Sequence, residues 1–94
     1  MAKAITLIAQ TLWPRAGDRV QYLMRMTDAA GAALIEAPPV IEVAEGDGRV
    51  EAIQSLDGDF PGLWLVNLRL GVVSSTNVFR FTSGEAVRTV KLTL

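Results

Sequence analysis

Carboxylates in two glycine-containing segments are the residues of this chain best suited to bind a metal ion. One segment holds Asp57 and Asp59 on either side of a glycine, and the other holds Glu45 and Asp47. Ca²⁺ prefers carboxylate oxygens, but it usually takes about six or more of them, and neither segment has the further ligands of an EF-hand loop. The alternative is a solvated turn in which the aspartates accept hydrogen bonds from nearby backbone amides. We expect that turn, with no metal or cofactor, and keep Asp57 and Asp59 as the metal candidates.

The residue types most often used for acid–base and nucleophilic catalysis are missing. The 94 residues include no histidine and no cysteine, which removes the commonest general base and the thiolate nucleophile. Ser74 and Ser75 therefore have no histidine to activate them, and we interpret them as a loop that leads into a strand. Paired carboxylates of the glycosidase kind need a cleft that raises the pKa of one of them. Because the acidic residues fall in expected turns or on solvent-facing positions, we predict no catalytic residues and no enzyme.

Charge is distributed unevenly along the chain. Residues 36–59 contain seven acidic residues against one arginine, whereas residues 1–35 carry a net charge of +2 and residues 60–94 carry +3. An acidic edge and a basic sheet on one domain would suit contact between copies. The alternative is that acidic and basic strands pair within one molecule. The charged candidates for an interface are Arg69, Arg80, Arg88, Glu45, Asp47 and Glu51.

Nucleic acid and membranes are not expected partners. The three arginines of the last third alternate in sequence with aromatic residues, as in a platform on which bases stack. However, the chain has six aromatic residues in all, which a small core needs, and its net charge of −1 supplies no general attraction to phosphate. No run approaches the roughly 20 apolar residues of a membrane span, and the N-terminus does not resemble a signal peptide. We expect a cytoplasmic protein, or a virion protein if a phage encodes it.

The elements that position these residues follow a period of two, which is typical of strands. Residues 19–27 alternate between apolar side chains and a face with Arg19, Gln21 and Arg25. Residues 63–70 are apolar on one face and carry Leu63 and Leu65 on the other, which indicates a central strand partly covered on both sides. Alternation continues over residues 77–82 and 87–94, and no stretch of a dozen residues has helical spacing. The pattern therefore predicts an all-β chain.

Turn-forming residues predict seven or eight short strands in one domain, residues 1–94. The first strand is expected over residues 3–13, hairpin turns at residues 28–31 and 45–48, and a last tight turn at residues 83–85. Pro38 and Pro39 predict an edge or a crossover between sheets, because proline cannot donate a ladder hydrogen bond. Two antiparallel sheets packed as a sandwich would close such a chain. Its large core candidates are Trp13, Tyr22, Trp64, Phe79 and Phe81.

Three segments carry a resemblance to a known family of folds. They are Val20-Gln21-Tyr22, residues 27–34 with an aspartate at position 28, and residues 57–65, where a strand follows a glycine. A strand that ends in an aspartate-containing hairpin, with a glycine-bounded strand later, resembles bacterial and phage immunoglobulin-like modules. The resemblance implies an immunoglobulin-like two-sheet sandwich over the whole chain, without the cysteine pair of antibody domains. It implies no particular ligand.

Assembly with other proteins is the function that these features favour. The chain has two lysines, so it has little of the charge that usually protects exposed sheet edges from pairing. An apolar face beyond the core would mark an interface. We expect a non-catalytic structural protein that acts through protein–protein contacts, as a homo-oligomer or in a larger assembly. Its most concrete form is a phage-like virion component, such as a capsid decoration or tail protein.

Two other functions remain open from the sequence. Residues 62–70, followed by Ser75-Thr76-Asn77-Val78-Phe79, resemble the last immunoglobulin-like module of bacterial family-two glycosidases such as β-mannosidases. That resemblance implies an accessory domain of a carbohydrate-active enzyme, which acts as a spacer. A carbohydrate-binding module is the third interpretation, with Trp13 or Trp64 as the platform on which a sugar ring stacks. This last interpretation requires an exposed tryptophan.

Overall fold

The computed structural model describes residues 2–11, 13–34, 38–56, 60 and 62–94, and none of these residues is helical. They form seven strands: β1 (Ala4–Ala9), β2 (Arg19–Thr27), β3 (Val40–Glu45), β4 (Arg49–Ser55), β5 (Leu63–Arg69), β6 (Thr76–Ser83) and β7 (Ala86–Thr93). The described part of the chain has no helix that could cross a bilayer.

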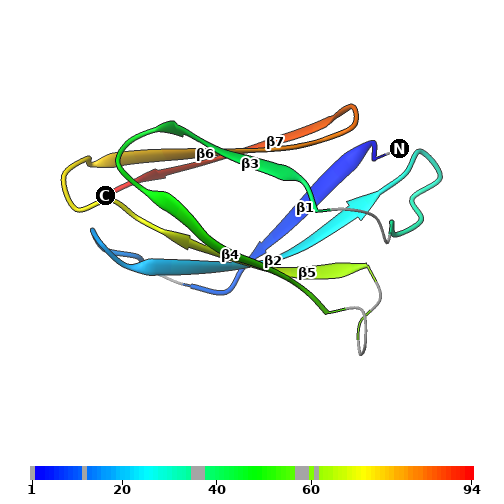
Figure 1. The fold of residues 1–94 in the computed structure, drawn as a ribbon, viewed down its shortest axis with the longest axis horizontal. Helices are drawn as coiled ribbons and strands as arrows, with labels where there is room; N and C mark the ends of the chain where they lie inside the picture. The colour runs from blue at the N-terminus through cyan, green and yellow to red at the C-terminus, as the bar shows by residue number, and fades with distance from the viewer. Residues whose placement is uncertain (1, 12, 35–37, 57–59, 61) are drawn as a thin grey trace.

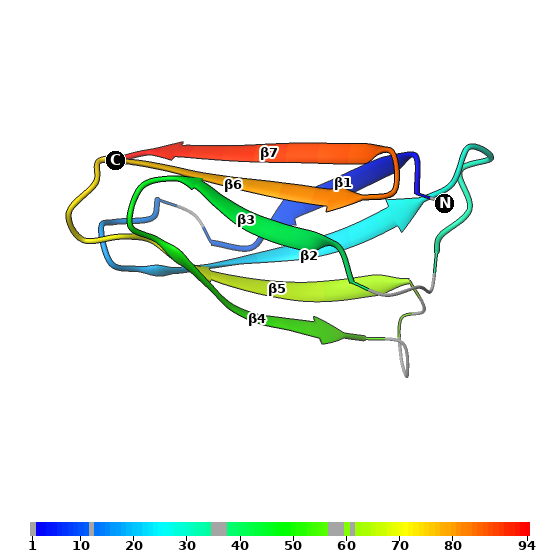
Figure 2. The ribbon, with the colours of Figure 1, turned by 45° about the horizontal axis from the view of Figure 1, so that its top comes forward.

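The strands form two antiparallel sheets that face each other (Figures 1 and 2). The four-stranded sheet has the order β1-β2-β5-β4, and the three-stranded sheet has the order β3-β6-β7. Every pair of neighbouring strands is antiparallel. The prediction of an all-β, two-sheet sandwich is therefore confirmed.

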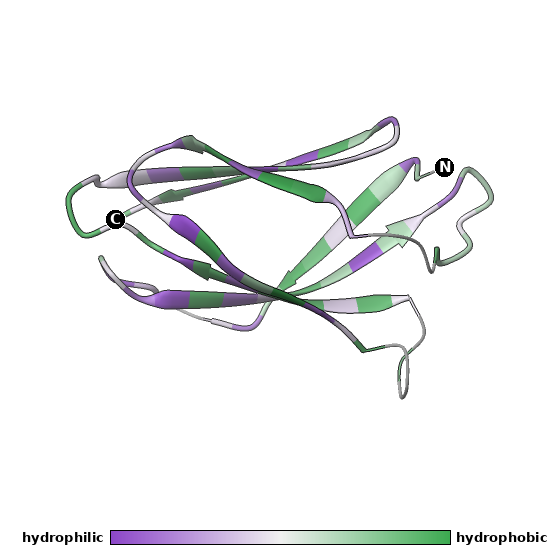
Figure 3. Ribbon diagram, viewed as in Figure 1, coloured by the Kyte–Doolittle hydropathy of each residue, from purple (hydrophilic) through white to green (hydrophobic). Residues whose placement is uncertain are grey.

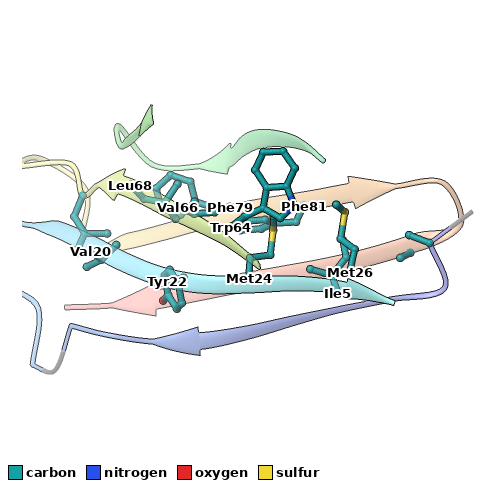
Figure 4. Close-up of a cluster of buried hydrophobic side chains, with 13 residues drawn as sticks. Ile5, Val20, Tyr22, Met24, Met26, Trp64, Val66, Leu68, Phe79 and Phe81 are labelled. Atoms are coloured by element: carbon teal, nitrogen blue, oxygen red, sulfur yellow. The ribbon is translucent and has the colours of Figure 1, made fainter. Parts of the chain in front are cut away.

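Hydrophobic and hydrophilic residues alternate along the strands (Figure 3), and the buried apolar side chains form a core between the sheets (Figure 4). The predicted apolar face of residues 19–27 is confirmed, because every second residue of β2 from Val20 onward is buried. The same holds for β5, whose opposite face is partly buried as well. The largest fully buried side chains are Phe79, Phe81, Met24, Met26, Leu68, Leu70, Val66 and Asn77.

Among the large core candidates, the prediction was wrong for Trp13, which is 90% exposed. The first strand ends at Ala9 rather than at residue 13. Beyond Ala9, the backbone N–H of Gln21 on β2 donates to the hydroxyl Oγ1 of Thr11 at 3.0 Å. A side-chain oxygen therefore replaces the backbone carbonyl that would accept this N–H in a continuing strand pair. The chain then leaves the sheet, and Trp13 adopts a φ of 55° in the connection.

Two expected hairpins are connections between the sheets instead. The turn at residues 28–31 forms as predicted, with Asp28 Oδ1 accepting the amides of Ala30 at 2.9 Å and Ala32 at 3.0 Å. The next strand, however, is β3 of the other sheet, so the predicted crossover at Pro38 and Pro39 is confirmed. Residues 46–48 likewise join β3 to β4 across the two sheets. The tight turn at residues 83–85 is confirmed as the hairpin between β6 and β7.

Candidate interaction surface

Glu51 lies in an intramolecular ion-pair cluster on the four-stranded sheet. Its Oε1 atom lies 2.7 Å from Nε of Arg69 on β5 and 3.3 Å from Nε of Arg19 on β2. The hydrogen bonds from Arg19 and Arg69 hold the pKa of Glu51 below its ordinary value. Two of the charged interface candidates, Glu51 and Arg69, therefore pair within one molecule, which was the alternative that the charge pattern left open.

Asp47 ties two connections of the sandwich together. It lies in the turn between β3 and β4, and its carboxylate accepts the backbone N–H groups of Val73 at 3.1 Å and Ser74 at 3.0 Å. These residues belong to the β5–β6 connection (residues 70–75). The hydrogen bond from Ser74 is the main reason why the pKa of Asp47 is lowered. The sequence predicted hydrogen bonds from nearby backbone amides, whereas the amides that bind this carboxylate come from a distant segment.

Asn77 holds the same connection from inside and was not predicted to have a role. Its side chain is fully buried at the start of β6. The Oδ1 atom accepts the backbone N–H of Gly71 at 3.1 Å, and Nδ2 donates to the carbonyl of Ser74 at 3.5 Å. A Cβ atom on Gly71 would lie 1.8 Å from Oδ1 of Asp47, so glycine is required there by close approach. The sequence feature that could have indicated this role is a polar asparagine at an inward-facing position of a strand that is otherwise apolar on that face.

The remaining charged candidates lie on the three-stranded sheet. Arg80 on β6 and Arg88 on β7 are exposed on the three-stranded sheet, and Glu45 is exposed at the end of β3. Arg80 lies opposite Glu42 of β3 in the sheet register. Their role at an interface stays a prediction.

The metal candidates Asp57 and Asp59 lie outside the described residues. In the part of the chain that the structure describes, no group of three or more histidine, cysteine, aspartate or glutamate residues is arranged to hold a metal ion.

The β1–β2 and β5–β6 connections meet at one end of the sandwich (left end in Figures 1 and 2), and each of them contains exposed apolar residues. The connections are joined by backbone hydrogen bonds from Gly17 N to Gly71 O at 3.2 Å and from Leu70 N to Asp18 O at 2.8 Å. Trp13, Val72 and Val73 are 90%, 74% and 85% exposed. We call these three residues the apolar end patch. Exposed apolar groups of this kind mark interaction sites when they cluster.

A second apolar feature lies on the outer face of the four-stranded sheet. The register places Ile8, Leu23 and Leu65 side by side across β1, β2 and β5. Ile8 is exposed, whereas Leu23 and Leu65 are half-buried. This row confirms that β5 is apolar on both faces, but it presents less free surface than the apolar end patch.

A cavity of about 240 Å³ opens at the same end as the patch. It lies between the β1–β2, β3–β4 and β5–β6 connections, and its charged lining consists of Asp47, Arg49 and Arg69. Val72 of the apolar end patch also lines it. The end of the sandwich therefore combines a charged cavity with exposed apolar side chains.

No protein-family model matches the chain. No solved structure matches it at a significant level. A protein of Myxococcus xanthus (strain DK1622) named "Uncharacterized oxidoreductase" is 38% identical over 66 residues, which are 69% of this chain and 26% of that protein. The chain thus spans about a quarter of the length of that relative.

Proposed function

We propose that this chain is a non-catalytic protein that acts through protein–protein contacts, and that the apolar end patch makes the contact with a second copy. The observation that carries the proposal is the exposure of Trp13, Val72 and Val73 in two hydrogen-bonded connections. Asp47 and Asn77 fix the backbone of the β5–β6 connection, so the two valines are displayed without a large ordering cost on binding. Apolar side chains in a rigid loop cluster are suited to the centre of an interface.

The strand order supports the immunoglobulin-like form of the fold. Sheets ordered β1-β2-β5-β4 and β3-β6-β7 correspond to the seven-strand arrangement of constant-type immunoglobulin domains. Domains of this architecture present loops at both ends of the sandwich, and loops on a rigid scaffold commonly carry binding residues. A virion component, such as a capsid decoration or tail protein, is the most specific form of the proposal and stays a prediction.

Light scattering over a concentration series tests the contact with a second copy. The mass should rise above the 10.1 kDa of one chain as concentration increases, and high salt should not reverse the rise, because the contact is apolar. The variant Trp13→Ser/Val72→Ser/Val73→Ser should remain at the mass of one chain. A matched control, Phe60→Ser/Val40→Ser/Val87→Ser, removes one aromatic and two valines that are also exposed but lie outside the patch. Wild-type protein that has the mass of one chain at every concentration would overturn the proposal.

A module of a larger enzyme is the second candidate, and the Myxococcus relative is the observation that favours it. The similar segment makes up 26% of a protein whose name describes an oxidoreductase. In this form the chain would be an accessory domain, as in the resemblance to the glycosidase modules. An antibody against this chain, applied to an extract of the source cells, separates the two candidates. A band near 10.1 kDa supports the free-standing protein, and a much longer polypeptide supports the module.

Trp13 also keeps the carbohydrate-binding interpretation open, because its indole is exposed, whereas Trp64 is packed in the core. A sugar ring stacked on Trp13 would change its fluorescence. Titration with soluble oligosaccharides tests this, with Trp13→Phe as the control for the origin of the signal. Unchanged emission at millimolar oligosaccharide would remove this interpretation.

A further inference from the structure

We propose that the cavity at the end of the sandwich binds an oxyanion, either a carboxylate or a phosphate group, through Arg49 and Arg69. The cavity lies between three connections and has both arginines in its lining. The proposal concerns a binding site next to the apolar end patch and does not depend on whether the patch associates with a second copy.

Three arginines form a row across the four-stranded sheet at this end. The register places Arg19 of β2 opposite Arg69 of β5, and Arg49 of β4 opposite Arg69 from the other side. Like charges directly opposite each other on neighbouring strands are unfavourable. The row therefore concentrates positive charge beside the cavity, and this charge needs anions to offset it.

The nearby carboxylates do not offset the whole row. Glu51 is shared between Arg19 and Arg69. Asp47 lines the cavity, but its two oxygens already accept the amides of Val73 and Ser74. Within the described ranges, no carboxylate lies within 4.0 Å of the Arg49 guanidinium. Glu51 thus serves two arginines, and the carboxylate of Asp47 is directed toward backbone donors.

The arginines have the chemistry to recognise an oxyanion. Arg69 is held in place because Nε donates to Glu51 at 2.7 Å and Nη1 donates to the carbonyl of Gly17 at 3.1 Å. Its Nη2 group has no acceptor in the part of the chain that the structure describes. Arg49, on the neighbouring strand, brings a second guanidinium to the same cavity. Planar guanidinium groups bind carboxylate and phosphate oxygens in pairs of hydrogen bonds.

The two sources of such an anion differ in kind. A phosphate group would come from a small molecule, whereas a carboxylate would come from an acidic side chain of another protein. If the anion is a carboxylate of another protein, the site adds a polar contact beside the apolar end patch. The inference then extends the proposed role in protein–protein contacts.

Thermal melting at constant ionic strength tests the site. Inorganic phosphate and acetate each replace chloride, at a protein concentration where light scattering gives the mass of one chain. Phosphate should raise the Tm of the wild type by several degrees, because an anion that binds the folded state stabilises it. The variant Arg49→Gln should lose this rise, and Arg80→Gln, an exposed arginine on the other sheet, should keep it. A rise with acetate alone assigns the site to carboxylates, a rise with phosphate alone assigns it to phosphates, and a rise with both shows that the site accepts either group.

Two results would overturn the proposal. One is a wild-type Tm that is the same in phosphate, in acetate and in chloride, and the other is an Arg49→Gln variant that responds to these anions as the wild type does. If Arg49→Gln does not fold, the Nε–Hε NMR signal of Arg69 in the wild type gives the answer, since phosphate should shift it and leave that of Arg80 unchanged. A site that binds phosphate in a protein that never associates would leave this inference standing and refute the contact with a second copy.

Discussion

Replacement of Asn77 by alanine tests whether the β5–β6 connection is held from inside the sandwich. The change removes the acceptor of the Gly71 N–H, a hydrogen bond of 3.1 Å in the buried interior. A buried donor left without a partner costs about 1–3 kcal/mol, so we expect the free energy of unfolding to fall by about 2 kcal/mol. For a domain of this size, such a loss lowers the Tm by about 8–16 °C. Urea denaturation measures the loss, with an unchanged m-value as the sign that both end states are preserved.

Asn67 provides the matched control for this experiment. It accepts a hydrogen bond of 3.1 Å from Nε2 of Gln21 on the partly exposed outer face. Because water can replace that bond, Asn67→Ala should cost only about 0.5 kcal/mol, at the low end for a hydrogen bond. Equal losses for Asn67→Ala and Asn77→Ala, or a loss below about 0.5 kcal/mol for Asn77→Ala, would refute the role given to Asn77.

Three further predictions concern the core, the carboxylates and the exposed tryptophan. Phe79→Ala should lower the free energy of unfolding by about 3–5 kcal/mol in urea, because the ring is fully buried; a loss of less than about 1 kcal/mol would contradict this packing. The pKa values of Asp47 and Glu51 are lower in the folded than in the unfolded chain, so their stabilisation is complete above the unfolded values and is lost as pH falls through the folded ones. The Tm should therefore fall below about pH 4, and less steeply in Asp47→Asn; a pH-independent Tm would show that neither carboxylate is bonded as described. At a protein concentration where light scattering gives the mass of one chain, acrylamide should quench Trp13 readily and leave the other, buried tryptophan shielded; a single shielded population there would contradict the exposure of Trp13.

The strand pattern could be predicted from sequence because burial between two sheets selects every second side chain. This explains why β2 and β5 were assigned with the correct inward faces. Turn residues were less informative, since they specify a local reversal but not the sheet that the next strand joins. Residues 28–31 form their turn as expected, yet β3 lies in the opposite sheet.

The candidate site depended on contacts between distant segments, which the sequence pattern does not contain. From the sequence, Asp47 is assigned only to a turn. Its hydrogen bonds from the amides of Val73 and Ser74 form only when the β3–β4 and β5–β6 connections meet in the fold. The exposure of Trp13 was missed because an aromatic residue near a strand was assigned to the core. The hydrogen bond that the backbone N–H of Gln21 on β2 donates to the Thr11 hydroxyl replaces ladder pairing before that residue is reached.

The central claim is that the apolar end patch contacts a second copy, and NMR dilution measures this most directly. Amide spectra of the wild type at low and high protein concentration would be compared residue by residue. We expect shift changes and line broadening in residues 10–18 and 70–75, and none in the amides of the β6–β7 hairpin at residues 83–85. Spectra that do not change with concentration, or changes confined to the outer face around Leu23 and Leu65, would contradict the claim.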